Sequence, residues 1–234
     1  MQSLNPTRIV QRQGREIMII GAIVLIAGMF CCGSSLAVFL LFSNNLIGTI
    51  LVALGGLILL VGVGLLIRGL TLRMENQPAL AVAEVLAREL DDSYTLVRNV
   101  SRRGLGYIDA VLIGPPGALV FRIVDQPGMF RNEGSDWLER KGGQTFVLSR
   151  MNATREAVTD IYALRKYLNR FNLSAVPVFG VIVFTNSQVQ LAARQPVVPI
   201  AELRTLPTVL RRDFLAENRV DKKTADAAVH VIYT

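Results

Sequence analysis

The sequence predicts an α/β domain that follows two membrane-spanning helices. Two long runs near the N-terminus, residues 17–42 and 46–67, are apolar and carry no charged side chain. Further along, helical spacing of apolar residues alternates with short β-branched runs that end at glycine or proline. This order of helix, strand hairpin, helix and buried strand is typical of a mixed sheet with helices on both faces.

The two apolar runs are long enough to span a bilayer. They contain 26 and 22 residues, and a helix needs roughly 20 to cross a hydrocarbon core of about 30 Å. Only Ser43, Asn44 and Asn45 lie between them, which predicts a tight helical hairpin. The first run is too long for a signal-peptide core and lacks a small-x-small cleavage site after it, so we expect it to be retained.

The charges that flank the hairpin predict its orientation. Three arginines precede the first run and two follow the second, whereas the connecting loop is uncharged. Positive residues stay on the cytoplasmic side of a membrane, so we expect a two-span protein of the cell membrane with both termini in the cytoplasm. These flanking residues are Arg8, Arg12, Arg15, Arg68 and Arg73.

Both spans are rich in small residues, which let helices approach each other closely in lipid. These residues explain packing of the two spans on each other, and they leave open a partner protein in the membrane. Neither span holds an ionisable Asp, Glu, Lys, Arg or His, which argues against a transporter, channel or pump. The small residues are Gly21, Gly28, Gly33, Ser34 and Ser35 in the first span, and Gly55, Gly56, Gly62 and Gly64 in the second.

Composition limits the chemistry outside the membrane. Of the formal net charge of +7, residues 1–74 contribute five arginines and one glutamate, whereas residues 75–234 hold 20 basic and 17 acidic side chains. Contact with anionic lipid headgroups explains the small positive excess of residues 75–234 at least as well as contact with nucleic acid does. Cys31 and Cys32 lie in the first span and His230 is the only histidine, which argues against a zinc site or a histidine base.

The pattern divides the chain into five parts. We expect residues 1–16 to be a cytoplasmic N-terminal segment, residues 17–67 the two spans, residues 68–78 a linker, residues 79–195 the α/β domain, and residues 196–234 a helical extension. The expected elements are helices over 79–90, 157–171, 203–215 and 222–232, strands over 94–100, 107–113, 118–124, 144–149, 176–185 and 188–191, and polar connections over 101–106 and 126–137.

A proline–glycine turn at residues 115–117 joins two neighbouring strands, because proline fixes φ and glycine permits positive φ. Side chains alternate across a strand, so Arg122 and Val124 share one face of the second strand. Paired strands lie about 4.8 Å apart, which lets facing side chains meet. Asp109 on the first strand and Arg122 on the second can therefore form an ion pair.

The order of features over residues 80–192 resembles the nuclease-related domain (NERD) family, a branch of the restriction-endonuclease-like fold. That family has a helix carrying a Glu, a short strand, an I-D-h-h-h strand, a G-h-h-h-I-E-x-K strand, a glycine, a tryptophan, and Asn-Pro-x-x-Gln opening a helix. The corresponding features are Glu84, YTLVRNV, YIDAVLIG, GALVFRIV, Gly128, Trp137 and the segment from Asn152 to Glu156. The resemblance implies a restriction-endonuclease-like mixed sheet flanked by helices.

The sequence departs from the family pattern at the catalytic residues. In such nucleases two carboxylates hold Mg²⁺ and the lysine orients or activates the attacking water. Here the Glu position holds Arg122 and the Lys position holds Val124, and only Asn152 of the last motif matches directly. The resemblance thus implies that Asp109 and Glu84 are remnants of a catalytic set.

Asp109 has three interpretations: a surviving metal ligand, a carboxylate hydrogen-bonded within the sheet, or the partner of Arg122 in a pair that excludes magnesium. One carboxylate is rarely enough for an all-protein Mg²⁺ site, so we expect no metal or other cofactor unless the domain is a nuclease. Asp125 would be a displaced ligand only if a bulge turned it to the face of Asp109. Glu84 would otherwise be a surface charge or a cap.

These observations predict a membrane-anchored, catalytically inactive nuclease-like domain that acts as an interaction or accessory module at the cytoplasmic face of the bilayer. The alternatives are a membrane-bound metal-dependent nuclease and a nucleic-acid-binding protein that does not cut. The missing Glu-x-Lys argues against the nuclease. The small net charge and the absence of aromatic residues among the basic ones argue against nucleic-acid binding.

Overall fold

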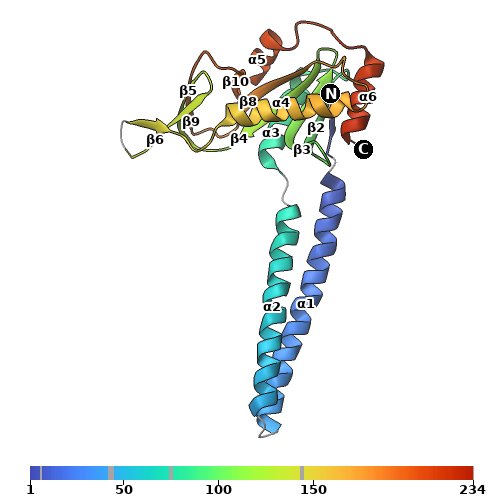
Figure 1. The fold of residues 1–234 in the computed structure, drawn as a ribbon, viewed down its shortest axis with the longest axis vertical. Helices are drawn as coiled ribbons and strands as arrows, with labels where there is room; N and C mark the ends of the chain where they lie inside the picture. Colours follow the sequence, from blue (N-terminus) through green and yellow to red (C-terminus); the bar gives the residue numbers. More distant parts are fainter. Residues whose placement is uncertain (6, 42–44, 74–75, 143–144, 234) are drawn as a thin grey trace. The chain divides into compact units, whose positions relative to one another are not determined.

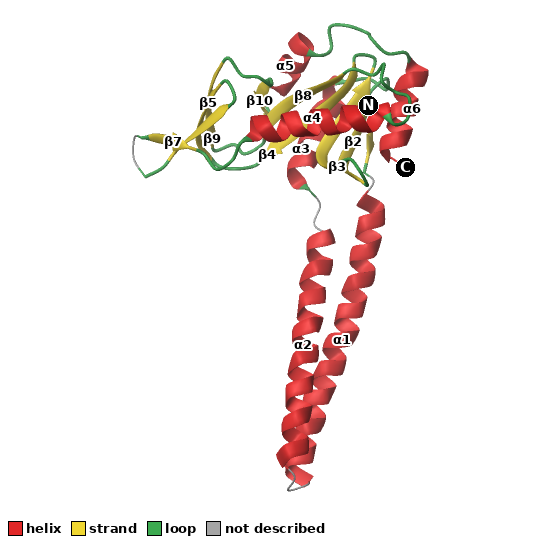
Figure 2. Cartoon of the chain, viewed as in Figure 1, coloured by secondary structure: helices red, strands yellow, loops and turns green. Residues whose placement is uncertain are grey.

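The computed structural model describes residues 1–5, 7–41, 45–73, 76–142 and 145–233 (Figures 1 and 2). The chain forms two compact units. One unit is Thr7–Glu75, and the other combines Met1–Pro6 with Asn76–Thr234. The helical hairpin is thus inserted, in sequence, between the first strand of the second unit and the rest of it.

Two helices make up the hairpin unit, α1 (Thr7–Leu41) and α2 (Asn45–Arg73). Within them, Ile17–Ser34 and Gly48–Ile67 are long and apolar enough to cross a membrane. The turn expected at residues 43–45 lies outside the described residues except for Asn45, which begins α2.

Glycines line the contact between α1 and α2. A Cβ atom added at Gly21, Gly28, Gly55 or Gly62 would lie no more than 3.0 Å from an atom of the opposite helix. The same addition at Gly33, Gly56 or Gly64 would meet no described atom within 4 Å. Four of the small residues therefore serve packing within the hairpin, as expected from their effect on helix approach.

The segment 68–78, expected to be a linker, is mostly helical. Helix α2 continues to Arg73, and α3 begins at Gln77. The expectation followed the end of the apolar run, but arginine and leucine sustain a helix equally well outside an apolar environment. Pro78 lies in the first turn of α3, where a missing N–H has no intrahelical partner to lose.

The second unit contains two sheets. A six-stranded mixed sheet has the order β1-β2-β3-β4-β8-β10, and a four-stranded sheet has the order β7-β6-β5-β9. In the larger sheet β2, β3 and β4 form an antiparallel meander. Strand β1 pairs in parallel with β2, and β8 pairs in parallel with both β4 and β10. The strands are β1 (Gln2–Leu4), β2 (Thr95–Arg102), β3 (Gly106–Gly114), β4 (Gly117–Val124), β5 (Gly128–Glu133), β6 (Asp136–Arg140), β7 (Phe146–Leu148), β8 (Val178–Phe184), β9 (Val189–Arg194) and β10 (Ile200–Glu202).

Helices cover both faces of the large sheet, which confirms the predicted fold class. Figure 1 shows α4 running across the near face, where it and α6 pack on one apolar cluster. Helices α3 and α5 pack on the cluster of the opposite face. These helices are α3 (Gln77–Glu89), α4 (Ala153–Asn169), α5 (Leu206–Asp213) and α6 (Lys222–Tyr233).

Three expected boundaries differ from the structure. The N-terminal segment contributes β1 to the sheet, and the expected helical extension contributes β10. Both strands have only three residues, too few for an alternating pattern to stand out. The polar connection 126–137 forms β5 and the start of β6, because only one face of these strands is buried and the other carries polar residues.

An aromatic cluster joins the two sheets to the start of α4. The ring of Trp137 lies 5.6 Å from that of Phe184, and the ring of Phe130 lies 5.8 Å from the same phenylalanine. The indole N–H of Trp137 donates to the hydroxyl of Thr154 at 2.8 Å, so the buried donor is satisfied. This cluster holds the first turns of α4 against the end of β4.

Candidate functional site

Asp109 lies on the face of the sheet that α4 covers. Its neighbour Ala110 faces the α3 side, so strand alternation turns Asp109 to the α4 side. The carboxylate is nearly buried, with 7% of the residue exposed. Its Oδ2 accepts the backbone N–H of Ile123 at 2.9 Å, just past the last β3–β4 pair, Ala110–Phe121. Of the three interpretations, the carboxylate bonded within the sheet is thus present.

Arg122 is the partner of Asp109, as the strand pairing predicts. Its Nη1 lies 3.6 Å from Oδ2 of Asp109, and its Nη2 contacts the carboxylate of Glu156 in the first turn of α4. The guanidinium therefore lies between carboxylates of the sheet and of the helix. Both the hydrogen bond within the sheet and the ion pair with Arg122 are therefore present at Asp109.

Asp160, one helical turn after Glu156, completes the cluster. Burial raises its pKa to about 6, and the charges of Asp109 and Glu156 act in the same direction against the opposing effect of Arg122. Its Oδ2 is buried and has no hydrogen-bond partner in the described part of the chain. Three carboxylates thus lie near one guanidinium, and below about pH 6 a proton on Asp160 relieves part of the negative excess.

Burial also raises the pKa of Asp109, and the charge of Glu156 adds to this effect. The N–H of Ile123 and the guanidinium of Arg122 oppose it. We refer to Asp109, Arg122, Glu156 and Asp160 as the guanidinium cluster. A shallow hollow of about 250 Å³ lies over its α4 side, lined by Arg122, Arg155, Glu156, Thr159 and Asp160.

The backbone opposite Asp109 is unusual. Asn99 of β2 has a φ of 53°, between the flanking pairs Arg98–Ala110 and Val100–Ile108. Asparagine tolerates this left-handed conformation better than other non-glycine residues. Its buried side chain accepts the hydroxyl of Tyr107 at 3.2 Å, so the residues beside Asp109 are held by a local polar network.

Val124, in the position of the family lysine, belongs to the core. It is 6% exposed and packs in the aromatic cluster with Trp137 and Phe184. Asn152, the one residue that matches the last family motif, is the N-cap of α4: its side chain accepts the N–H of Arg155 at 2.9 Å. Val124 thus has a structural role, and Asn152 fixes where α4, the helix that carries Glu156 and Asp160, begins.

The structure does not bring Glu84 or Asp125 to the guanidinium cluster. Glu84 is exposed on α3, whose buried residues pack on the opposite face of the sheet. Asp125 follows the end of β4, is exposed, and accepts the hydroxyl of Thr185 at 2.9 Å. The missed residues are Glu156 and Asp160. Their spacing of four on an amphipathic helix signals a shared face, but nothing in the sequence pairs that face with Arg122.

The donor set of this cluster does not fit the magnesium site of the family motif. Asp109 already binds the N–H of Ile123 and faces a guanidinium, which brings a fixed positive charge to the position of the second carboxylate. No group of three or more His, Cys, Asp or Glu among the described residues is arranged to hold a metal ion. We therefore derive no metal-dependent step from these residues.

Several arginines that could contact phosphate are engaged within the domain. Arg102 donates from Nε to the carbonyl of Ile232 at 2.9 Å, at the end of α6. Arg211 pairs with Glu89, and Arg212 lies 2.6 Å from Asp213. The contacts of Arg102 and Arg211 join helices to the fold, whereas Arg212 pairs with its neighbour on the same helix.

Comparison with known families agrees with this architecture. The model of the family described as nuclease-related domain matches residues 75–185, which include β2 to β4, α4 and β8 and hold the whole guanidinium cluster. No curated protein and no solved structure matches the chain. The chain therefore carries a nuclease-related domain, NERD, over residues 75–185.

Proposed function

We propose that the chain is a membrane-anchored NERD protein that has lost nuclease chemistry and serves as an interaction or accessory module at the cytoplasmic face of the membrane. The observation that carries the proposal is the ion pairing of Arg122 with Asp109 and Glu156. A guanidinium supplies the positive charge that a divalent cation would otherwise bring to these carboxylates. It cannot act as a Lewis acid or bind the attacking water in the way a metal does.

The burial of Val124 supports the same proposal. A lysine at this position would have to place its ammonium group among Trp137, Phe130 and Phe184, where an unpaired charge is costly. The domain thus differs from the family motif at two positions that are each built into their surroundings. Neither difference is a loose surface substitution.

The anchor supports a location at the membrane. Strand β1 precedes α1 and strand β2 follows α3 in one sheet, so both ends of the hairpin lead into the same folded unit. If both apolar stretches span the bilayer, that unit lies on one side. The flanking arginines favour the cytoplasmic side, and the bilayer is then the first partner of the chain.

A nuclease assay tests the proposal. The full chain in detergent micelles is incubated with labelled duplex and single-stranded DNA and RNA in Mg²⁺ or Mn²⁺, beside the Asp109→Ala variant. We expect no cleavage above that of the variant. Cleavage that is lost in Asp109→Ala would overturn the proposal in favour of a metal-dependent nuclease, with Glu156 and Asp160 as the next residues to substitute.

Nucleic-acid binding without cleavage is the second candidate, and the contacts of Arg102, Arg211 and Arg212 within the fold weigh against it. A gel-shift titration at two salt concentrations tests it, because phosphate contacts weaken steeply as salt rises. We expect no shift with the full chain at physiological salt.

A further inference from the structure

The outer edge of strand β8 is only half covered. On its inner side β8 pairs with β4 along its whole length, from Val178 to Phe184. On its outer side β10 pairs only from Ile182 onward. Among the described residues, the first half of this edge therefore lies beside no partner strand.

The hydrogen bonds identify the backbone groups that face this edge. The N–H of Ile182 donates outward to the carbonyl of Pro199 at 2.9 Å. Alternate residues of a strand direct their backbone groups to the same side, so Gly180 and Val178 face outward as well. The carbonyl of Val178 accepts Nη2 of Arg165 at 3.4 Å, as this alternation requires.

Gly180 lies between these two satisfied positions. The β10 ladder cannot extend to its carbonyl because Pro199, the next residue in line, has no N–H. Within the described part of the chain, neither the N–H nor the C=O of Gly180 has a hydrogen-bond partner on this side. Gly180 is buried and lines the cavity described next, so a donor and an acceptor on one residue are left without a partner beside that cavity.

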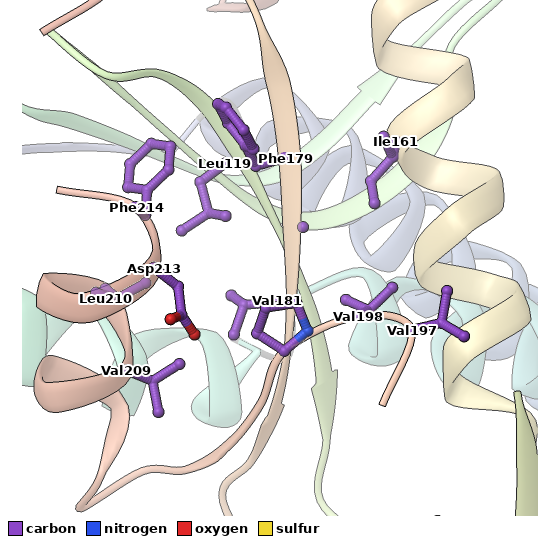
Figure 3. Close-up of a pocket in the computed structure, with 12 residues that line it drawn as sticks. Leu119, Ile161, Phe179, Val181, Val197, Val198, Val209, Leu210, Asp213 and Phe214 are labelled. Atoms are coloured by element: carbon purple, nitrogen blue, oxygen red, sulfur yellow. The ribbon is translucent and has the colours of Figure 1, made fainter. Parts of the chain in front are cut away.

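An apolar cavity of about 210 Å³ lies at the same place. Figure 3 shows Ile161 of α4 on one side of β8, with Val209, Leu210 and Phe214 on the other. Val197, at the entrance, is 61% exposed. Of the described residues that line the cavity, Asp213 alone is charged, and Arg212 neutralises it at 2.6 Å.

We propose that this edge binds an extended peptide segment of a partner protein by strand addition. The segment accepts from the N–H of Gly180, donates to its C=O, and places one aliphatic or aromatic side chain in the cavity. A hydrocarbon chain would fill the cavity but leave both backbone groups of Gly180 unpaired, which is costly once water is excluded. Because Asp213 is already paired, the side chain in the cavity is uncharged.

This inference rests on the proposed function and deepens it, since it assigns a class of partner to the module. It also uses a surface separate from the guanidinium cluster, which lies on β3, β4 and the first half of α4. A peptide bound at β8 would therefore leave Arg122 and its carboxylates in place.

Hydrogen exchange at Gly180 tests the proposal with the full chain in detergent micelles. The probes are blocked seven-residue peptides of alternating Thr and Val with Leu, Ile, Val or Phe at the centre. Without peptide, we expect the N–H of Gly180 to exchange at least about tenfold faster than that of Ile182. At saturating peptide, at least one probe slows exchange at Gly180 by about tenfold or more.

Two controls separate strand pairing from apolar adhesion. The same peptide with its central amide N-methylated keeps the apolar side chain but loses the donor, and we expect it to give no protection. Val209→Phe fills the cavity and weakens peptide binding by about tenfold, whereas Val147→Phe on the distant strand β7 leaves it unchanged. The fluorescence of Trp137, the only tryptophan, reports whether each variant is folded.

Three results would overturn the peptide site. These are equal protection of Gly180 and Ile182 without peptide, no slowing by any probe, or equal protection by the N-methylated peptide. None of these results tests the proposed loss of catalysis, which the nuclease assay decides. Conversely, cleavage that depends on Asp109 would overturn the proposed function and leave the protection of Gly180 to be judged on its own.

Discussion

Arg122 of strand β4 and Glu156 of helix α4 form an ion pair that links the central sheet to the first turn of the helix. In the pattern of the family these two positions hold a glutamate and a glutamine. By the resemblance drawn from the sequence, a basic side chain thus stands at an acidic position of the strand, and an acidic one stands at an amide position of the helix. The two departures from the pattern meet in space and compensate each other in charge.

This exchange accounts for the environment of Asp109. With a glutamate at position 122, Asp109 would need a cation to offset two neighbouring carboxylates. With Arg122 there, the cation is part of the chain and is present whether or not metal is supplied. Glu156 also lies in the first turn of α4, where a negative charge interacts favourably with the helix dipole.

Replacing Arg122 should therefore destabilise the domain. Arg122→Met leaves Asp109, Glu156 and Asp160 facing one another without a cation, and we expect the free energy of unfolding to fall by about 2 kcal/mol at pH 7.5. Without the guanidinium the carboxylates take up protons more readily in the folded state, so the loss should shrink as the pH falls toward 5. Denaturant unfolding followed by Trp137 fluorescence measures both effects.

Arg155→Met is the matched control, because Arg155 is exposed on the rim of the same hollow. We expect it to change the free energy of unfolding by no more than about 0.5 kcal/mol. Equal losses in the two variants, or a loss in Arg122→Met that does not depend on pH, would contradict the assigned role of Arg122.

Asp160 should make stability depend on pH. Its pKa of about 6 lies above the ordinary value of 3.8, so its ionised form is disfavoured in the folded state. Its contribution to stability is complete below about pH 4 and is lost as the pH rises through 6. Asp160→Asn removes the ionisation and should raise the free energy of unfolding by about 1 kcal/mol at pH 7.5, a value reduced for partial exposure, with no effect at pH 4.

The exposed Asp226 of α6 provides the comparison, and Asp226→Asn should leave the free energy of unfolding the same at both pH values. A titration of the Asp160 carboxyl by NMR gives the pKa directly. A midpoint near 4 would refute the buried, unpartnered position of this side chain.

The sequence was sufficient for those contacts that follow from local periodicity. Two strands joined by a tight turn bring Asp109 opposite Arg122, because antiparallel pairing is set by the turn. Asn152 was predictable as an N-cap because its side chain acts on the N–H three residues later. In both cases the partners are connected by a short, regular piece of backbone.

The contacts that the sequence did not predict join elements far apart in the chain. Glu156 reaches Arg122 only because α4 packs at one particular height on β4, which the buried contacts of Ala153 and Ala157 and the aromatic cluster determine. Strands β1 and β10 were missed because their parallel partners lie at long sequence separation and each has three residues. Packing of whole elements, more than local propensity, decided these features.

Replacing Val124 by the lysine of the family pattern should destabilise the domain. Val124→Lys places an ammonium group against Trp137 and Phe184, and we expect a loss of about 3 kcal/mol or more in the free energy of unfolding. The same change at Val147, which is 40% exposed on β7, should cost no more than about 0.5 kcal/mol. Similar unfolding midpoints for the two variants would show that position 124 accepts a lysine, and would contradict the destabilisation expected from its burial.

The glycines of the hairpin predict a specific cross-link. A Cβ atom added at Gly55 would lie 2.5 Å from Sγ of Cys32, so Gly55→Cys should form an intramolecular disulfide with Cys32 on oxidation after a small rotation of that side chain. Cys31→Ala is used as the background, so that Cys32 is the only native thiol left. Oxidation in micelles followed by maleimide labelling and mass spectrometry counts the remaining thiols.

Gly56→Cys is the control for this cross-link, because a Cβ atom there meets no described atom within 4 Å. We expect both thiols of this variant to stay free, with no intramolecular disulfide. A disulfide between two chains at this position would reveal a second copy on the outer face of α2, in line with a membrane partner that uses the remaining small residues. Failure of Gly55→Cys to cross-link, or intramolecular cross-linking of both variants alike, would contradict the packing of α1 on α2, because that packing brings Gly55 and only Gly55 of the two against Cys32.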